Sequence, residues 1–285
     1  MKHDGKWAQQ LIRLQRPDGS WGDFHTLSAQ HAGHVTTEQA LRRLEILGYT
    51  AEDEPVALAV SYLVDCLEGR KRIPDRAEKV QDWEVFVSLM LSAWIRRFTH
   101  ECPEAERTAR LWSAIISAAF ESGSYDQSAS NAAYRHAFGC SPKGGRLADF
   151  VSFYQVSLVA DLLDETAASA FVDHVLHHNA GIYYVYDKPL AILPECFASR
   201  QTVRYLNAIE LLAGYRSVAS KLHFVHEWLK DNSSTDGTWD LGTAAKDGIS
   251  FPLSDSWRSP ENRIADCTER VRRLLDHMNF QRPEE

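Results

Sequence analysis

Residues 11–21 read LIRLQRPDGSW, and residues 229–239 repeat the phrase as LKDNSSTDGTW without a gap. Each copy has the composition of a helix end, a tight Asp-Gly turn and a tryptophan. Shorter echoes stand between them, at Gly123-Ser124-Tyr125 and Gly181-Ile182-Tyr183. Internal repetition is the signature of a fold built from one repeated supersecondary unit.

A glycine stands in each turn, and Gly69 marks a further, worn copy. The glycines at 19, 69, 123, 181 and 237 lie 50 to 58 residues apart. This regular spacing predicts five repeats of a helical hairpin, or six hairpins if residues 127–138 form an extra helix.

Helical periodicity accounts for most of the chain, and 182–186 is a short strand candidate. Amphipathic helices should precede the turns, at 5–15, 53–68, 104–121, 165–178 and 217–231. A second set should follow them, at 34–48, 80–98, 147–163, 198–215 and 260–278. The helices at 80–98 and 147–163 are apolar on nearly all sides, which predicts burial on all sides.

Amphipathic helices that alternate with buried ones predict an all-α fold, an α/α toroid in which outer helices surround inner ones. We expect one domain over residues 1–285, a two-layer ring of five or six hairpins. An open solenoid is the alternative, although it should show wet faces on both layers. In a ring the inner helices run in one direction, so their first turns gather at one end.

The composition is that of an ordinary globular protein, with 285 residues, 44% hydrophobic and 25% charged. The formal net charge is -8, so the composition gives no sign of the basic surface that binds nucleic acid. No run approaches the ~18 apolar residues that span a bilayer, and residues 1–6 have no signal core. Five scattered cysteines fit reduced thiols. We therefore expect a cytoplasmic protein.

Residues 14–22, LQRPDGSWG, resemble the QW repeat of squalene-hopene and oxidosqualene cyclases, and the related repeat of protein prenyltransferase β subunits. Residues 34–41 are similar to the inner helix that follows the repeat in this superfamily. The resemblance implies an α/α toroid with a central cavity. It also has a physical sense, because Gln15 can bond backbone groups at the helix end while Trp21 packs across the neighbouring outer helix.

The catalytic motifs of these families are absent from the sequence. The cyclases use an Asp-x-Asp-Asp motif, which this chain lacks. The prenyltransferases bind zinc through an Asp-x-Cys pair, whereas Asp65-Cys66 and Asp266-Cys267 are adjacent and point about 100° apart on a helix. The resemblance therefore implies the fold and a cavity, and it implies no cofactor and no catalytic residue.

Three His-x-x-His pairs place two imidazoles on one helix face: His31/His34, His174/His177 and His223/His226. His178 adds a third ring beside the second pair. Imidazole is a common metal ligand, but rings at the end of an outer helix are also favoured as cations by the helix dipole. We expect no metal site.

The predicted first turns of the inner helices supply the candidate site. The candidate catalytic carboxylates are Asp82, Glu84 and Asp266. The candidate substrate-binding residues are His34, Glu38, Tyr154, Arg200, Arg204, Tyr205 and Arg263. Helix capping, ion pairing and core hydrogen bonds are the structural alternatives for these residues. The tyrosines at 183, 184 and 186 are interpreted as packing, with an aromatic rim as the alternative.

Two functions remain open at this point, and the sequence leaves open whether the chain is an enzyme. The first is the binding or transformation of an apolar, isoprenoid-like ligand with an anionic head, held by Arg200 and Arg204 in the cavity. The second is a non-enzymatic binding or assembly module on the same scaffold. Carbohydrate chemistry by two cavity carboxylates is a further alternative. The oligomeric state is open as well.

Overall fold

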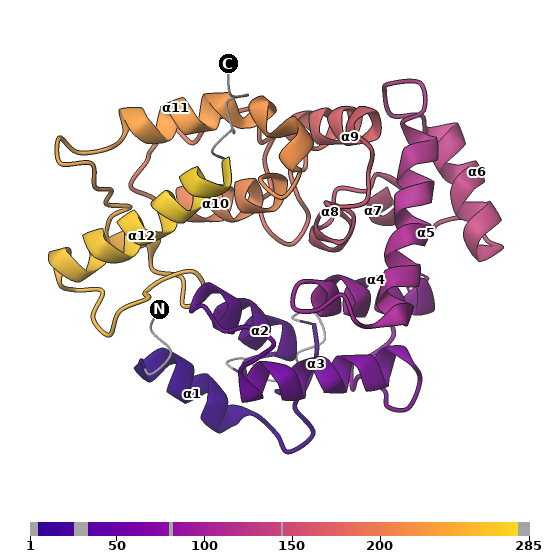
Figure 1. Cartoon of the computed structure of the whole chain (residues 1–285), viewed down its shortest axis with the longest axis horizontal. Helices are drawn as coiled ribbons and strands as arrows, with labels where there is room; N and C mark the ends of the chain where they lie inside the picture. Colours follow the sequence, from indigo (N-terminus) through magenta and orange to yellow (C-terminus); the bar gives the residue numbers. More distant parts are fainter. Residues whose placement is uncertain (1–4, 26–33, 80–81, 144, 279–285) are drawn as a thin grey trace. The chain divides into compact units, whose positions relative to one another are not determined.

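The computed structural model describes residues 5–25, 34–79, 82–143 and 145–278. Every regular element in these ranges is a helix, and β pairing is confined to two isolated bridges. The all-α prediction is therefore confirmed for the described residues (Figure 1). None of the described helices has both the length and the apolar character that crossing a bilayer requires.

The chain divides into two compact units. The first contains residues 1–109 and 247–255, and the second contains residues 110–246 and 256–285. The boundary falls inside helix α5 (Pro103–Ala119). The single domain and the ring stay predictions.

The first unit begins with four helices in the predicted order. They are α1 (Lys6–Leu14), α2 (Thr37–Ile46), α3 (Glu54–Leu67) and α4 (Trp83–Arg96), and the start of α5 follows. Helix α2 opens with a capping box between Thr36 and Gln39, which satisfies donors at its first turn. Helix α4 has no exposed residue from 85 to 95, as its all-round apolar sequence predicts.

Helices α2 and α4, which were predicted as inner helices, run in the same direction. Both begin beside residues 23–25, because the Thr37 N–H donates to the Asp23 carbonyl over 2.9 Å and Phe86 packs edge-on against His25. After the last turn of α4, Arg97 Nε donates to Glu45 near the end of α2 over 2.9 Å. The expected common direction is thus present within this unit.

The second unit holds the remaining helices. They are the rest of α5, then α6 (Gln127–Phe138), α7 (Gly145–Ala148), α8 (Phe153–Leu158), α9 (Glu165–His177), α10 (Arg200–Leu212), the 3-10 helix η1 (Arg216–Leu222), α11 (His223–Asp231), the 3-10 turn η2 (Thr243–Ala245) and α12 (Pro260–Met278). The extra helix that the sequence left open at 127–138 does form. The outer helix expected at 217–231 is split, since Val218 has non-helical dihedral angles.

The helix predicted at 147–163 is wrong as a continuous element. Phe150 adopts φ 63°, and the following residues pair with the chain near Tyr183 instead of continuing a helix. Ser152 and Tyr183 form a parallel bridge, and only then does α8 begin, capped by the Ser152 hydroxyl. Burial is as predicted, because residues 147–160 contain no exposed residue. The apolar run at 147–163 therefore predicts that these residues are buried, and it does not predict how long the helix is.

Helices α8 and α10 also run in the same direction. Both begin beside residues 182–186: Phe153 N–H donates to the Tyr183 carbonyl over 3.1 Å, and Arg204 Nε donates to the Val185 carbonyl over 3.2 Å. Beyond the end of α10, the buried Tyr215 hydroxyl donates to the Val156 carbonyl over 2.6 Å. Their first turns therefore share one neighbouring segment.

The five repeat glycines adopt one local conformation. Each has a positive φ, between 62° and 92°. Each donates its N–H to the carbonyl three residues earlier, over 2.8 to 3.2 Å. Gly69 shares this geometry, and so does Gly48 after α2, so the geometry shows a turn at Gly69 and leaves its place in the repeat a prediction.

The two tryptophans of the full copies have equivalent contacts. Trp21 Nε1 donates to the Leu11 carbonyl and Trp239 Nε1 donates to the Leu229 carbonyl, each over 2.7 Å. Their backbone N–H groups donate to threonine hydroxyls of α2 and α12, over 2.9 and 3.0 Å. Both rings are buried. Each tryptophan thus ties the end of the preceding helix, α1 or α11, to the helix that follows it, α2 or α12; the expected packing of Trp21 across the neighbouring outer helix stays a prediction.

Candidate functional site

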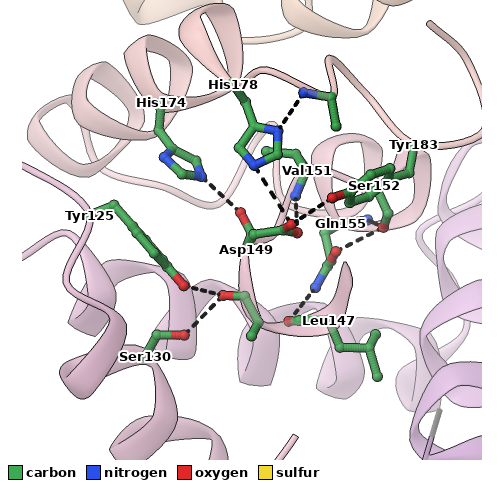
Figure 2. A network of polar contacts seen from close by, with 12 residues as sticks. Tyr125, Ser130, Leu147, Asp149, Val151, Ser152, Gln155, His174, His178 and Tyr183 are labelled. Atoms are coloured by element: carbon green, nitrogen blue, oxygen red, sulfur yellow. Dashed lines mark hydrogen bonds and ion pairs between the residues drawn. The ribbon is translucent and has the colours of Figure 1, made fainter. Parts of the chain in front are cut away.

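A polar cluster in the second unit surrounds Asp149, which lies between α7 and α8 (Figure 2). We call it the Asp149 centre and define it as Asp149, His174, His178, Tyr183 and Tyr125. The histidines come from α9 and its C-terminal cap, and the tyrosines come from the two degenerate repeat turns. The centre therefore combines four separate stretches of sequence.

The Asp149 carboxylate lies between a phenol and an imidazole. The Tyr183 hydroxyl donates to Asp149 Oδ2 over 2.9 Å, and His178 Nε2 lies 3.7 Å from the same oxygen. The Ala180 N–H donates to His178 Nδ1 over 3.3 Å, so Nδ1 acts as acceptor and the neutral ring carries its proton on Nε2. The proton-bearing nitrogen of His178 therefore faces the carboxylate (Figure 2).

His174 contacts the backbone of the same residue. Its Nε2 lies 2.9 Å from the Asp149 carbonyl, which can only accept, so Nε2 is the donor. The ring also stacks on Tyr125 with centroids 4.7 Å apart. Asp149 is thus held at both its side chain and its carbonyl.

The two residues before Asp149 are anchored as well. The Ala148 carbonyl accepts from the Tyr125 hydroxyl over 2.6 Å and from the Ser130 hydroxyl over 3.1 Å. Gln155 Nε2 donates to the Leu147 carbonyl over 3.1 Å. Because consecutive carbonyls are fixed by side chains, the position of the Asp149 backbone is strongly determined.

The backbone next to the centre is strained. Phe150 and Tyr184 have φ values of 63° and 73°, and they are the non-glycine residues of the described chain with positive φ. Bulky aromatic residues rarely adopt this conformation, and such outliers cluster at functional sites. Phe150 follows Asp149 and Tyr184 follows Tyr183, so each member of the hydrogen-bonded pair is followed directly by a strained residue.

Burial shifts the titration of two groups at the centre in opposite directions. Desolvation by burial raises the pKa of the Asp149 carboxyl, although the Tyr183 hydrogen bond and the neighbouring histidines oppose it. Desolvation also lowers the pKa of His174. Burial therefore disfavours the cationic form of His174, which its position at a helix C-terminus would by itself favour. The site disfavours charge on both groups.

Sequence analysis singled out parts of this centre but missed Asp149. His174 and His178 stood out as a potential metal cluster, and Tyr125 and Tyr183 as echoes of the repeat. The available signal was the replacement of the repeat tryptophan by tyrosine at both echoes. An indole N–H can only donate a hydrogen bond, whereas a phenol can both donate and accept one.

The predicted site residues of the first unit lie at the starts of α2 and α4. The Glu38 carboxylate is buried and accepts from Trp94 Nε1 and from Arg42, each over 3.3 Å. Asp82 occupies the N-cap position of α4, while Glu84 and His34 are exposed. Glu38 therefore has structural partners within the unit.

In the second unit, Tyr154, Arg204 and Tyr205 share one neighbourhood. The Tyr154 ring lies 5.5 Å from Tyr184, and the Tyr205 ring lies 5.5 Å from Tyr186. The Tyr205 hydroxyl donates to the Leu190 carbonyl over 3.0 Å. Residues 182–186 thus pack against the starts of α8 and α10, which supports packing over an aromatic rim.

The remaining predicted residues have separate partners. Arg200 donates to the Lys246 carbonyl over 3.0 Å. Arg263 forms a two-pronged pair with Asp240, with both N–O distances 2.7 Å. Asp266 is fully buried. A cleft of about 580 Å³ lies along α12, and its lining includes none of the predicted residues.

Compared with protein-family models, with curated proteins and with solved structures, the chain matches none of them. The likeness to cyclases and prenyltransferase β subunits therefore rests on the repeat alone. Function has to be inferred from the sites in the chain itself.

Proposed function

We propose that this chain is a small-molecule enzyme on an α/α-toroid scaffold. Its ligand has an apolar body and an anionic head. Arg200 and Arg204, at the first turn of α10, bind the anionic head, and Asp149 exchanges a proton with the ligand. The toroid is inferred from the repeat and from the shared directions of α2 with α4 and of α8 with α10, and the activity is inferred from the features that follow.

One short segment carries the proposal, because it connects the two groups. Tyr183 donates to the Asp149 carboxylate, and the carbonyl of Val185, two residues later, accepts from Arg204. Two residues of chain span at most about 7 Å, and here they lie in a turn closed by the Ile182–Tyr186 bridge. A carboxyl with a burial-raised pKa and a guanidinium are therefore held by the same few residues, with the strained Tyr184 between them.

The first turn of α10 is suited to an anion. The Arg204 side chain is 46% exposed, and its nearest carboxylate, Asp187, is 73% exposed and 3.6 Å away. Such an exposed pair is weak and exchanges readily for a better anionic partner. Arg200 contacts a backbone carbonyl, and the helix N-terminus adds a positive potential. A carboxylate or diphosphate head would gain charge-assisted hydrogen bonds there.

The Asp149 centre is suited to proton transfer. Because burial raises the pKa of its carboxyl, Asp149 keeps its proton to higher pH than an exposed aspartate and acts as base once it is lost. Its side chain is 18% exposed, so the carboxyl is not sealed from solvent. His178 and Tyr183 are both placed to hydrogen-bond the carboxylate form.

The test combines binding with isotope exchange. A panel of anionic amphiphiles, prenyl diphosphates and fatty acids included, is screened by thermal shift against wild type, Arg204→Ala and the surface control Arg135→Ala. Compounds that stabilise wild type and Arg135→Ala but not Arg204→Ala are then incubated in D2O. Mass spectrometry measures deuterium in the recovered compound with wild type and with Asp149→Asn.

We expect wild type to introduce deuterium and Asp149→Asn to lose at least 100-fold of that rate, the usual contribution of a positioned acid or base. Binding with no chemical change in any compound would favour the alternative, a non-enzymatic binding module. Equal stabilisation of wild type and Arg204→Ala would refute the anionic subsite. Carbohydrate chemistry has less support, because the network in Figure 2 contains one carboxylate and glycosidases use two.

A further inference from the structure

A second cluster of potential ligands lies on the first turns of α11, apart from the residues of the proposed reaction. His223 is the first residue of α11, and His226 and Glu227 stand three and four positions later. His226 and Glu227 each share a helix face with His223, at i+3 and i+4, and although they are neighbours their side chains bend together to a 3.0 Å contact. One ligand atom from each lies within 4.8 Å of the others.

The two rings and the carboxylate lie close together on α11. The imidazoles of His223 and His226 are stacked, with centroids 6.0 Å apart and planes 20° from parallel. His226 Nδ1 lies 3.0 Å from Glu227 Oε1. Ligand atoms of a tetrahedral zinc site, with bonds of about 2.0–2.1 Å, lie about 3.3 Å apart. The His226–Glu227 distance is close to this value, and a ligand atom of His223 lies within 4.8 Å of both partners.

The cluster is accessible, and the cation beside it is weakly held. His223 and Glu227 are exposed, and His226 is half-buried. Lys230 Nζ lies 3.6 Å from Glu227 Oε1, and both side chains are at least half exposed. An ion pair of this kind contributes little and can be displaced by a divalent ion.

We propose that His223, His226 and Glu227 bind one divalent transition-metal ion, with water completing its coordination. Two imidazoles and a carboxylate suit Zn²⁺, Ni²⁺ and Co²⁺, whereas Ca²⁺ and Mg²⁺ require oxygen ligands. The ion would join the first turn of α11 to its second. Because α11 follows the irregular η1, this link would stabilise the helix that precedes the second full repeat turn.

Metal binding is measured by isothermal titration of the full chain, freed of any affinity tag, with ZnCl₂, NiCl₂ and CaCl₂. Three variants are compared with wild type: His226→Ala, Glu227→Gln and the control His136→Ala, which removes an exposed histidine of α6. Glu227→Gln keeps the shape of the side chain, so it separates loss of a ligand from loss of structure. Amide hydrogen exchange of residues 223–231 provides a readout on the helix itself.

We expect one equivalent of Zn²⁺ or Ni²⁺ in wild type and in His136→Ala, and none of Ca²⁺. His226→Ala and Glu227→Gln should each weaken binding by tenfold or more, since even groups that support a ligand have effects of about this size. Exchange in α11 should slow on adding zinc to wild type only. The proposal is overturned if wild type takes up no zinc, or if both ligand variants bind it as tightly as wild type.

Discussion

Replacing the two repeat tryptophans by phenylalanine tests whether the repeat is a structural device. Trp21→Phe and Trp239→Phe keep an aromatic ring in each buried position and remove the indole N–H. In both copies that N–H donates over 2.7 Å to a leucine carbonyl ten residues earlier. The rings are only 5% and 7% exposed, so water cannot easily replace the lost donor.

The expected loss follows from the contacts. A buried carbonyl left without its donor costs about 1–3 kcal/mol, and the smaller ring adds a packing loss. Trp→Ala removes the ring too and should cost about 3–5 kcal/mol at either position. Because the two copies have matching contacts, Trp21→Phe and Trp239→Phe should agree within about 1 kcal/mol.

Guanidinium denaturation followed by far-ultraviolet circular dichroism measures these changes. Leu14→Ala is the matched control, because Leu14 precedes the same turn but is 59% exposed, and it should change stability by less than about 0.5 kcal/mol. If the two units unfold in separate transitions, each tryptophan variant should shift only the transition of its own unit. The structural role of the repeat is refuted if the phenylalanine variants lose no more stability than Leu14→Ala does. It is also refuted if the substitution leaves stability unchanged in one copy and lowers it severely in the other.

Three further predictions follow. Burial raises the pKa of the Asp149 carboxyl, so protonation of this group stabilises the fold below its unfolded pKa, and that stabilisation is lost as pH rises through its folded pKa. Asp149→Asn does not titrate and should therefore gain stability relative to wild type as pH rises through this interval. Denaturation midpoints measured from pH 3 to 8 check this. Gly237→Ala should cost only the strain of a left-handed backbone, about 1–2 kcal/mol. Gly19→Ala should destabilise the protein more, because a Cβ at Gly19 would also meet an α3 carbonyl at 2.3 Å. Iodoacetamide should label exposed Cys196 at pH 8 and leave Cys267 unmodified in the native protein, because burial raises the Cys267 pKa to about 12; mass spectrometry of the peptides decides this.

Helix positions could be predicted because the information is local. The glycine turns, the capping residues and the 3.6-residue period each act over a few positions, and helices such as α4 and α6 begin and end within about three residues of the sequence-based ranges. The helix at 147–163 failed for the opposite reason. Its interruption depends on Tyr183, more than 30 residues away, which pairs with residues 151–153. Nothing within residues 147–163 records that partner.

The candidate site was harder to predict, because it depends on which distant groups meet. Arg43 of α2 is an example from the first unit: it is a charged residue, yet it is buried and donates to the carbonyls of Ile249 and Pro252. Asp149 looked like an ordinary loop aspartate, and only the fold places Tyr183 and His178 beside its carboxylate. Sequence patterns identified the residue types and could not identify their partners.

The contrast between the full and degenerate repeat turns points to where function would arise. At Trp21 and Trp239 the side-chain donor returns to the end of the preceding helix, which closes the local unit. At Tyr125 and Tyr183 the donor instead reaches the neighbouring segment 148–149. Each tyrosine therefore gives up a local tie: Tyr183 gains a hydrogen bond to the Asp149 carboxylate, and Tyr125 gains one to the carbonyl of the preceding residue, Ala148. Departures from a structural rule are expected at functional sites, and here two such departures reach adjacent residues beside a strained backbone.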